Sequence, residues 1–253
     1  KQVVCHVREN RDGTLESLTF GQAISRCVDP IEKKPLYHYH PGSLSYSIAA
    51  AGCNFKCPWC QNWEIAQAPA EGRELTARES DPEEIVSEAV RTGCRSIAYT
   101  YTEPTVYFDY ALSISQLAHR TGIGNVFVTN GYMSVEALDL LRGLLDAANV
   151  DLKAFSDETY RKHIGARLQP VLDSLKAMKQ NGVWVEVTTL LIPGINDSPE
   201  ELRDLAGFIS DDLGPDVPWH VSRFHPAHKM TDWAATPIET ILAAREIGME
   251  AGL

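Results

Sequence analysis

The sharpest chemical signal in the sequence is a group of three cysteines, Cys53, Cys57 and Cys60, within one stretch of eight residues. Thiolates are soft ligands for iron–sulfur clusters or zinc, and spacings of three and two residues let one short loop surround a metal centre. A structural zinc site uses four protein ligands, whereas this loop supplies three thiols and has no fourth nearby. The spacing therefore predicts a catalytic metal centre with one open position, and a structural zinc knuckle is the simpler alternative.

The other three cysteines carry a weaker signal. Cys94 precedes a predicted strand, so we expect a buried, unreactive thiol at the closed end of the fold. Cys5 and Cys27 are interpreted as structural residues; a pair between them, or a small metal site completed by a preceding segment, are the alternatives. Because crowded cysteines suit metal binding in a reducing compartment, we expect a cytoplasmic protein.

Polar side chains recur where the predicted strands end. In a parallel barrel the carboxyl ends of all strands open on one face, so we expect these side chains to meet the cysteine loop at one mouth. They belong to five segments that follow this loop: Thr100-Tyr101-Thr102-Glu103-Pro104; Thr129-Asn130-Gly131; Asp151-Leu152-Lys153; Glu186, Thr188 and Thr189; and His220, Ser222, Arg223 and His225.

The elements that must position these residues follow one repeating order, a strand-like run, a turn and a helical run. Several of the runs are apolar nearly throughout, as strands buried on both faces are. The six predicted strands are residues 44–51, 96–102, 125–129, 148–153, 183–191 and 219–224. Helix starts are indicated by capping residues, most of them followed by proline: Asp81-Pro82, Ser134, Ser198-Pro199 and Thr236-Pro237.

Six alternations of strand and helix predict an α/β fold with parallel strands joined by right-handed crossovers. An open doubly wound sheet would satisfy the same pattern, but we favour a partial TIM-like (β/α)6 barrel over residues 44–253. Residues 1–43 show no comparable pattern, and we expect them to form an irregular N-terminal extension packed on the barrel.

Composition narrows the classes of partner. The formal net charge of −11 disfavours a nucleic-acid partner, since no basic stripe offsets it. No apolar run reaches the roughly 18 residues that cross a bilayer, and no targeting signal is visible, so we expect no membrane association.

At this point the sequence resembles a known family. Cys-x3-Cys-x2-Cys with the aromatic Trp59 before the last cysteine is similar to the signature of radical S-adenosylmethionine enzymes. The resemblance covers residues 44–225 and implies a [4Fe-4S] cluster, with S-adenosylmethionine at the iron that lacks a protein ligand. More narrowly, three stretches resemble the AmmeMemoRadiSam-system radical proteins, relatives of pyruvate formate-lyase activating enzyme: Asp29-Pro30-Ile31-Glu32-Lys33-Lys34-Pro35-Leu36-Tyr37-His38, Cys60-Gln61-Asn62-Trp63 and Ser222-Arg223-Phe224-His225-Pro226.

The family motifs imply roles for the residues at the mouth. Thr102-Glu103-Pro104 resembles the motif that binds the ammonium of S-adenosylmethionine, although Tyr101-Thr102 stands where the wider family has paired glycines. Thr129-Asn130-Gly131 is similar to a motif of glycyl-radical activating enzymes, and Asp151-Leu152-Lys153 resembles the motif near the carboxylate of S-adenosylmethionine. Trp59 is expected to stack on adenine.

Structural alternatives exist for each of these residues. Glu103 is equally a helix N-terminal carboxylate, Asp151 with Lys153 an ion pair at the barrel rim, and Asn130 with Gly131 a turn. His220, Arg223 and His225 are candidate substrate contacts, and His220 and His225 are alternatively core and rim histidines. His38 and His40 are expected to be structural.

Three functions are compatible with this reading. The first is a radical enzyme that abstracts hydrogen from a protein, peptide or other partner and takes electrons from a donor such as flavodoxin or ferredoxin. The second keeps the radical chemistry but acts on a small molecule, as 7-carboxy-7-deazaguanine synthase does. The third is a zinc-stabilised binding module without catalysis.

Overall fold

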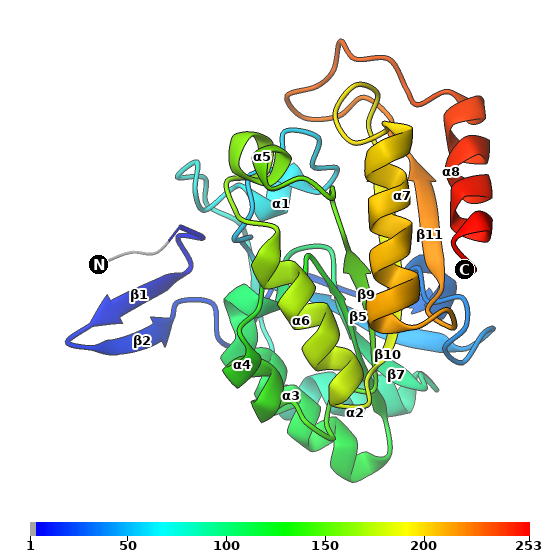
Figure 1. Ribbon diagram of the computed structural model, residues 1–253. Coiled ribbons are helices and arrows are strands. Elements are labelled where there is room, and N and C mark those ends of the chain that lie inside the picture. The colour runs from blue at the N-terminus through cyan, green and yellow to red at the C-terminus, as the bar shows by residue number, and fades with distance from the viewer. Residues whose placement is uncertain (1–3) are drawn as a thin grey trace.

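The computed structural model covers the chain and describes residues 4–253 (Figure 1). The first three residues of the predicted extension lie outside this range. Within it, no helix is long and apolar enough to cross a membrane.

A seven-stranded sheet forms the centre of the molecule, in the order β11-β10-β9-β8-β7-β5-β4. All neighbouring pairs are parallel except β4 and β5, so the six predicted strands form the parallel part, as the sequence indicates. The strands are β4 (Ser25–Pro30), β5 (Leu44–Ala49), β7 (Ser96–Tyr99), β8 (Gly124–Thr129), β9 (Ala147–Asp151), β10 (Trp184–Leu191) and β11 (Trp219–Arg223). Because β4 and β11 are not paired, the barrel is partial.

The longer helices cover the outside of this sheet, and the short α1 and α5 lie above it in Figure 1. The helices are α1 (Trp63–Ala66), α2 (Pro82–Arg91), α3 (Phe108–Thr121), α4 (Val135–Leu140), α5 (Asp157–Thr159), α6 (Gln169–Gln180), α7 (Pro199–Phe208) and α8 (Ile238–Glu250). Short 3-10 helices span Ile31–Lys33 and Pro104–Tyr107, and π-helical turns extend α5 and α7 over Tyr160–Ile164 and Ile209–Leu213.

Three of the four predicted helix starts are confirmed, although the side chain of Asp81 makes no capping hydrogen bond to α2. The side chains of Ser134 and Ser198 accept hydrogen bonds from the backbone N–H groups of Ala137 and Glu201, the usual N-cap arrangement. The predicted start at Thr236 is wrong in detail. The hydroxyl of Thr236 accepts from the N–H of Phe224 and donates to a strand carbonyl, so it fixes the end of β11, and α8 begins two residues later.

The N-terminal segment is more regular than the sequence analysis predicts. β1 (Arg8–Arg11) and β2 (Thr14–Ser17) form a hairpin that projects from the side of the barrel (Figure 1). β3 (Gln22–Ala23) pairs with β6 (Arg78–Glu79), and all six residues of β4 pair with β5. The segment Ser25–Pro30 has no apolar alternation, so its strand comes from the neighbouring edge rather than from its own pattern.

The segment after β4 fills the barrel where the strands begin. Ile31 and Leu36 are fully buried against Ala98, Val126 and Ala147, which lie side by side on β7, β8 and β9. Small residues on the inner face leave room for this segment, residues 31–43, which we call the plug segment. It closes one end of the barrel and leaves the carboxyl ends of the strands open.

The remaining cysteines are free thiols. Cys5 and Cys27 are therefore not joined, and the sulfur of Cys27 lies 3.2 Å from a carboxylate oxygen of Asp29. Cys94 is buried just before β7, as predicted.

Candidate functional site

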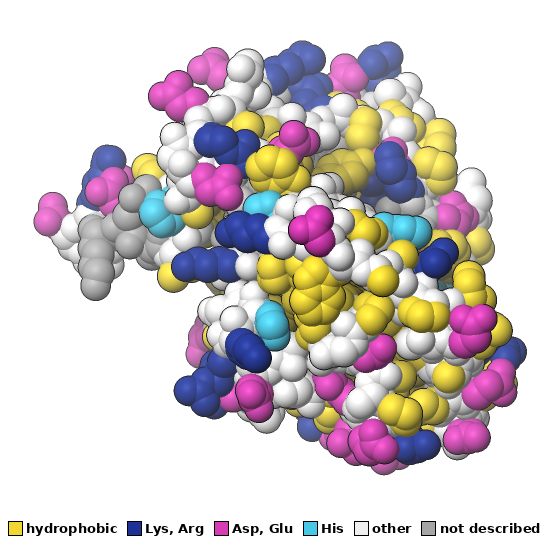
Figure 2. Space-filling view, turned by 90° about the horizontal axis from the view of Figure 1, so that it is seen from above, with side chains coloured by type: hydrophobic (Ala, Val, Ile, Leu, Met, Phe, Trp, Pro, Cys, Tyr) yellow, Lys and Arg dark blue, Asp and Glu magenta, His cyan; other side chains and the backbone are white. Residues whose placement is uncertain are grey.

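A cavity of about 470 Å³ opens where the parallel strands end. Its lining includes most of the residues predicted for the mouth: Cys53, Cys57, Trp59, Cys60, Glu103, Thr129, Asn130, Asp151, Lys153 and Arg223. Figure 2 looks down on this face and shows lysine, arginine and histidine side chains among apolar ones. The face is thus not uniformly acidic, although the chain carries a net charge of −11.

Backbone contacts fix the cysteine loop. It begins at Gly52, which has a φ of +101°, and a Cβ there would lie 3.0 Å from a methyl group of Val7. The N–H of Lys56 donates to the carbonyl of Ile164 at 2.9 Å, and the side-chain amide of Gln67 donates to the carbonyl of Phe55 at 3.0 Å. The loop is therefore held in place from both sides.

The three thiols are not arranged as nucleophiles. Burial raises the pKa of all three, that of Cys57 to about 12, and the negative charge of Glu103 adds to the effect at Cys53. A reactive cysteine needs a lowered pKa, so thiol catalysis is disfavoured. A bound metal deprotonates its thiol ligands outright, and metal binding is the chemistry that suits this loop.

The spacing of the sulfur atoms argues against a single zinc ion. Zinc bound at about 2.3 Å to each thiolate would hold the sulfurs about 3.8 Å apart. Among the His, Cys, Asp and Glu side chains of residues 4–253, only two histidines and a glutamate elsewhere bring three ligand atoms within 4.8 Å of one another. The three cysteine sulfurs therefore do not all lie within 4.8 Å of one another. Wider separation fits an iron–sulfur cluster, in which each thiolate binds a different iron.

Glu103 joins the ends of two neighbouring strands. Its Oε1 accepts hydrogen bonds from the N–H and the hydroxyl of Thr105 and from the hydroxyl of Thr129, at 2.6–3.0 Å. Its Oε2 accepts only from the N–H of Asn130, at 2.8 Å, so this oxygen has capacity for a further donor. The bond from the Thr105 N–H confirms the predicted N-terminal role, and burial raises the pKa of Glu103.

Asp151 and Lys153 form the predicted ion pair at the end of β9. Their Oδ2 and Nζ atoms lie 2.8 Å apart. Burial disfavours the charge of Lys153, but Asp151 and Cys57 outweigh it and raise the pKa of the ammonium. A positive charge therefore stays beside the cysteine loop.

Asn130 connects the end of β8 to the cysteine loop. Its side-chain amide donates to Asn54 Oδ1 at 2.7 Å and lies 3.7 Å from the sulfur of Cys53. Gly131 follows with a φ of +69°, and a Cβ there would lie 2.8 Å from a methyl group of Val150. The predicted turn at Asn130 and Gly131 thus also brings an N–H donor to a cysteine sulfur.

Trp59 forms part of the cavity wall and is 3% exposed. Its indole N–H has no acceptor among the described residues, although buried N–H groups are nearly always paired. An unpartnered donor in the wall of a cavity fits a site that binds a polar ligand. Arg223 lines the same cavity and donates from Nε to the carbonyl of Thr236.

The remaining candidates do not join this cavity. Glu186 and His220 are the third residue of β10 and the second of β11, so they lie near the strand starts, contrary to the prediction for the mouth. His220 lines a second cavity of about 900 Å³. His225 is exposed after β11 and lines neither cavity.

Burial would raise the pKa of Glu186, but hydrogen bonds from His220, from the Trp184 indole and from the backbone lower it to about 2. Its backbone donors are the N–H groups of Tyr37 and His38, at 3.0 and 2.9 Å. Glu186 thus ties the plug segment to β10.

Other residues in the cavity wall were not predicted as site residues. They include Lys33 and Pro35 from the plug segment and the inward-facing Asn149 of β9, whereas Tyr101, Thr188 and Ser222 line the cavity as the sequence analysis expects. Strand alternation could have indicated the inward-facing positions, since the side chains at every second residue point inward. Nothing in the sequence indicates that the segment after β4 turns into the barrel.

Comparisons with known proteins identify the family. The sequence profile of the Radical SAM superfamily matches residues 47–206. An uncharacterized protein of Methanocaldococcus jannaschii is 46% identical over 249 residues, which are 98% of this chain and 73% of that protein. Pyruvate formate-lyase-activating enzyme of Clostridium pasteurianum is 27% identical over 169 residues, 63% of this chain and 67% of the enzyme.

Among solved structures, a radical SAM methyltransferase from Sphaerobacter thermophilus superposes with a TM-score of 0.62 at 18% identity. The match covers 85% of this chain and 66% of that one, and it concerns the fold alone. Because the superfamily profile matches more than half of the chain and includes the three cysteines, the chain belongs to the radical SAM superfamily.

Proposed function

We propose that Cys53, Cys57 and Cys60 hold the [4Fe-4S] cluster of this radical SAM enzyme, and that the rest of the cavity binds S-adenosylmethionine. The observation that carries this proposal is one cavity of about 470 Å³ lined by the three cysteines, the ion pair of Asp151 and Lys153, and a buried glutamate with a free acceptor position. When bound, the reduced cluster supplies one electron that cleaves S-adenosylmethionine to methionine and a 5′-deoxyadenosyl radical.

The protein's own residues position the reactants and exclude water. Oε2 of Glu103 offers the acceptor for the ammonium of S-adenosylmethionine, as a charge-assisted hydrogen bond in a buried place. Lys153 supplies positive charge for the carboxylate, while Thr129 and Asn130 position Glu103 and the cysteine loop through their own hydrogen bonds. Trp59 offers its ring face and its unpartnered N–H to the adenine.

We infer further that the hydrogen is abstracted from a protein or peptide. The relationship to pyruvate formate-lyase-activating enzyme supports this substrate class, since that enzyme's name states that it acts on another enzyme. A one-electron donor such as flavodoxin or ferredoxin would supply the reductant.

The assignment of the cysteines is tested with anaerobically reconstituted protein. We expect about four irons per chain and 5′-deoxyadenosine formation under a strong reductant. Cys57→Ala should lose both, whereas Cys94→Ala, a buried cysteine outside the cavity, should keep both. If Cys57→Ala formed 5′-deoxyadenosine at the parental rate, the ligand assignment would be wrong. The zinc-stabilised module predicts colourless protein with one zinc per chain, and membership in the superfamily argues against it.

The role of Glu103 is tested by Glu103→Gln, which keeps the shape of the side chain and removes its charge. We expect weaker binding of S-adenosylmethionine with an unchanged iron content, and no change in the exposed control Glu79→Gln. Unchanged affinity of Glu103→Gln would remove this residue from the site.

The substrate class is tested by deuterium transfer. An extract of deuterated cells that express this chain is separated by size and added to the reconstituted enzyme with unlabelled S-adenosylmethionine. Deuterium in 5′-deoxyadenosine from the macromolecular fraction alone supports a protein or peptide substrate. Deuterium from the small-molecule fraction alone would instead support the second candidate, an enzyme that acts on a small molecule.

A further inference from the structure

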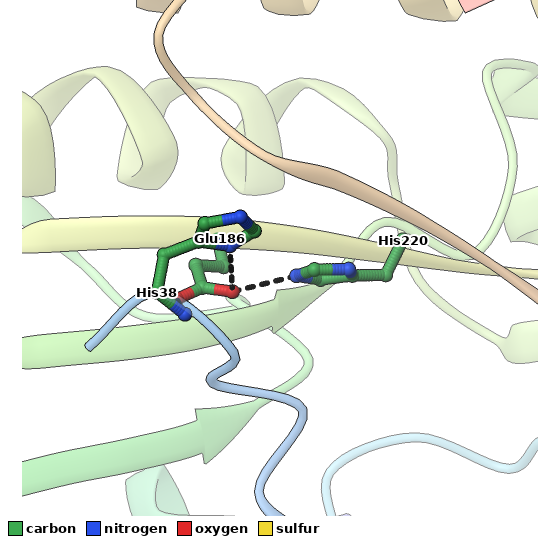
Figure 3. Close-up of side chains that lie close together, drawn as sticks. All are labelled: His38, Glu186 and His220. Atoms are coloured by element: carbon green, nitrogen blue, oxygen red, sulfur yellow. Dashed lines mark hydrogen bonds and ion pairs between the residues drawn. The ribbon is translucent and has the colours of Figure 1, made fainter. Parts of the chain in front are cut away.

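A second group of metal-binding side chains lies away from the cysteines. His38 Nδ1 and His220 Nε2 both face Oε2 of Glu186, at 3.4 and 2.6 Å (Figure 3). The three potential ligand atoms lie within 4.8 Å of one another. The two imidazole rings are nearly parallel, with centroids 6.0 Å apart.

Three separate parts of the chain supply these residues. Glu186 is on β10 and His220 is on the neighbouring strand β11, while His38 comes from the plug segment, 148 residues before Glu186. The indole N–H of Trp184 and the backbone N–H of His38 both donate to Oε1 of Glu186, at 3.0 and 2.9 Å. These donors orient the carboxylate so that Oε2 faces both histidines, as outer hydrogen bonds do for metal ligands.

One of the two distances fits ligands of a single ion, and the other is slightly short. Two ligand atoms that each lie about 2.1 Å from an ion are about 3.0–3.4 Å apart for angles between the octahedral and tetrahedral values. The separation of His38 Nδ1 from Glu186 Oε2 is at the upper limit of this range, and that of His220 Nε2 is about 0.4 Å below it. A small withdrawal of the His220 ring would complete the geometry.

The group is accessible from solvent on one side. The side chain of His38 is 58% exposed and that of His220 is 19% exposed, whereas Glu186 is fully buried behind them. Both histidines line the second cavity, which shares Pro35, Thr188 and Ser222 with the cysteine cavity. An ion held here would have open coordination positions toward a space that adjoins the cysteine cavity.

We propose that His38, Glu186 and His220 bind one divalent transition-metal ion of the zinc(II) or iron(II) class. Two imidazoles and one carboxylate with open positions are a ligand set that these ions use in proteins. The proposal does not depend on the radical chemistry. The other role for the three residues is purely structural, a hydrogen-bonded anchor that ties the plug segment to the sheet.

The test uses the reconstituted holoenzyme and zinc(II) as the probe. After incubation with zinc and desalting, we expect about one zinc in addition to four irons per chain. His38→Ala and His220→Ala should each bind zinc at least tenfold more weakly. His119→Ala, an exposed histidine on α3, should bind it like the parent.

Two further measurements separate the outcomes. Extended X-ray absorption fine structure at the zinc edge should show nitrogen and oxygen neighbours near 2.0–2.2 Å and no sulfur at about 2.3 Å. This result would exclude zinc bound in the cysteine loop. The iron content of the same samples reports on the cluster independently. Equal zinc retention by the parent and by His38→Ala and His220→Ala, or zinc bound through sulfur, would overturn the proposal and leave the structural anchor.

Discussion

Lys34 Nζ lies 2.7 Å from Asp29 Oδ2, and the lysine side chain is completely buried. Asp29 is the fifth residue of β4, and Lys34 follows the short 3-10 helix that begins the plug segment. Asp29 also accepts hydrogen bonds from the hydroxyls of Ser47 and Tyr101, so it joins the edge strand, the first barrel strand and the loop before Glu103. This network holds the plug segment beside the site.

Removing the negative charge of this pair should destabilise the fold strongly. Asp29→Asn leaves the ammonium of Lys34 buried without a counter-charge. Removing one partner of a buried ion pair lowers the free energy of unfolding by about 3–5 kcal/mol. Lys33→Ala is the matched control, because Lys33 also contacts Asp29 but is 57% exposed, and its loss should change stability much less. Urea unfolding of both variants measures the difference. Equal stability changes for the two variants would contradict the importance of the buried pair.

The same carboxylate should make the fold sensitive to acid. Burial would raise the pKa of Asp29, but hydrogen bonds from Lys33, Lys34, Tyr101 and Ser47 hold it far below its ordinary value of 3.8. A depressed folded-state pKa contributes stability above the unfolded-state pKa, and this contribution is lost as the pH falls below that value toward the folded-state pKa. Below about pH 4 the loss approaches about 1.4 kcal/mol per pH unit.

Unfolding free energies of the full chain without its cluster, measured between pH 5 and pH 2, check this expectation. The parent should lose stability more steeply than Asp29→Asn below pH 4, and the two curves should run parallel above pH 5. Parallel curves over the whole range would show that Asp29 titrates alike in the folded and unfolded states.

Tyr101 has a φ of +66°, in the left-handed region that a bulky residue rarely adopts. Its hydroxyl is bound to Asp29 and to Lys34. We interpret these contacts as the compensation for the strained backbone that leads into Glu103.

Because of this strain, glycine should be more stable than alanine at position 101, the reverse of their usual order in a helix. Tyr101→Gly and Tyr101→Ala both lose the ring and the hydroxyl, but only alanine keeps a Cβ in the left-handed conformation, which costs about 1–2 kcal/mol. Tyr101→Gly should therefore be more stable than Tyr101→Ala by about 1 kcal/mol in urea unfolding. At Gln116, exposed within α3, the order should be reversed. Alanine favoured at both positions would show that Tyr101 carries no backbone strain.

The sequence predicted those parts of the fold that have a local pattern. Apolar runs and capping residues such as Ser134 and Ser198 mark the parallel strands and helices, because burial and N-capping act over a few residues. β4 was missed because Ser25–Pro30 owes its strand structure to pairing with β5. The six parallel strands and the cysteine loop were thus predictable, and the edge strand was not.

The relation between His38 and Glu186 could not be predicted for a different reason. The residues are 148 positions apart, and their contact depends on the segment after β4 turning into the barrel where the strands begin. Glu186 and His220 were assigned to the mouth because the sequence marks inward-facing positions but not their depth along a strand. The motifs that bring Cys53 and Glu103 together follow strand ends directly, and their common cavity was predictable.

The amide of Asn130 should tune the proposed cluster. Its side-chain nitrogen lies 3.7 Å from the sulfur of Cys53, and N–H donors to ligand sulfurs stabilise the more negative, reduced state of an iron–sulfur cluster. Asn130→Ala removes this donor and should shift the midpoint potential to a more negative value. Gln61→Ala, an exposed residue that lines the same cavity, should leave the potential unchanged. A redox titration followed by electron paramagnetic resonance measures both variants. An unchanged or more positive potential in Asn130→Ala would mean that this amide does not stabilise the reduced cluster through the sulfur of Cys53.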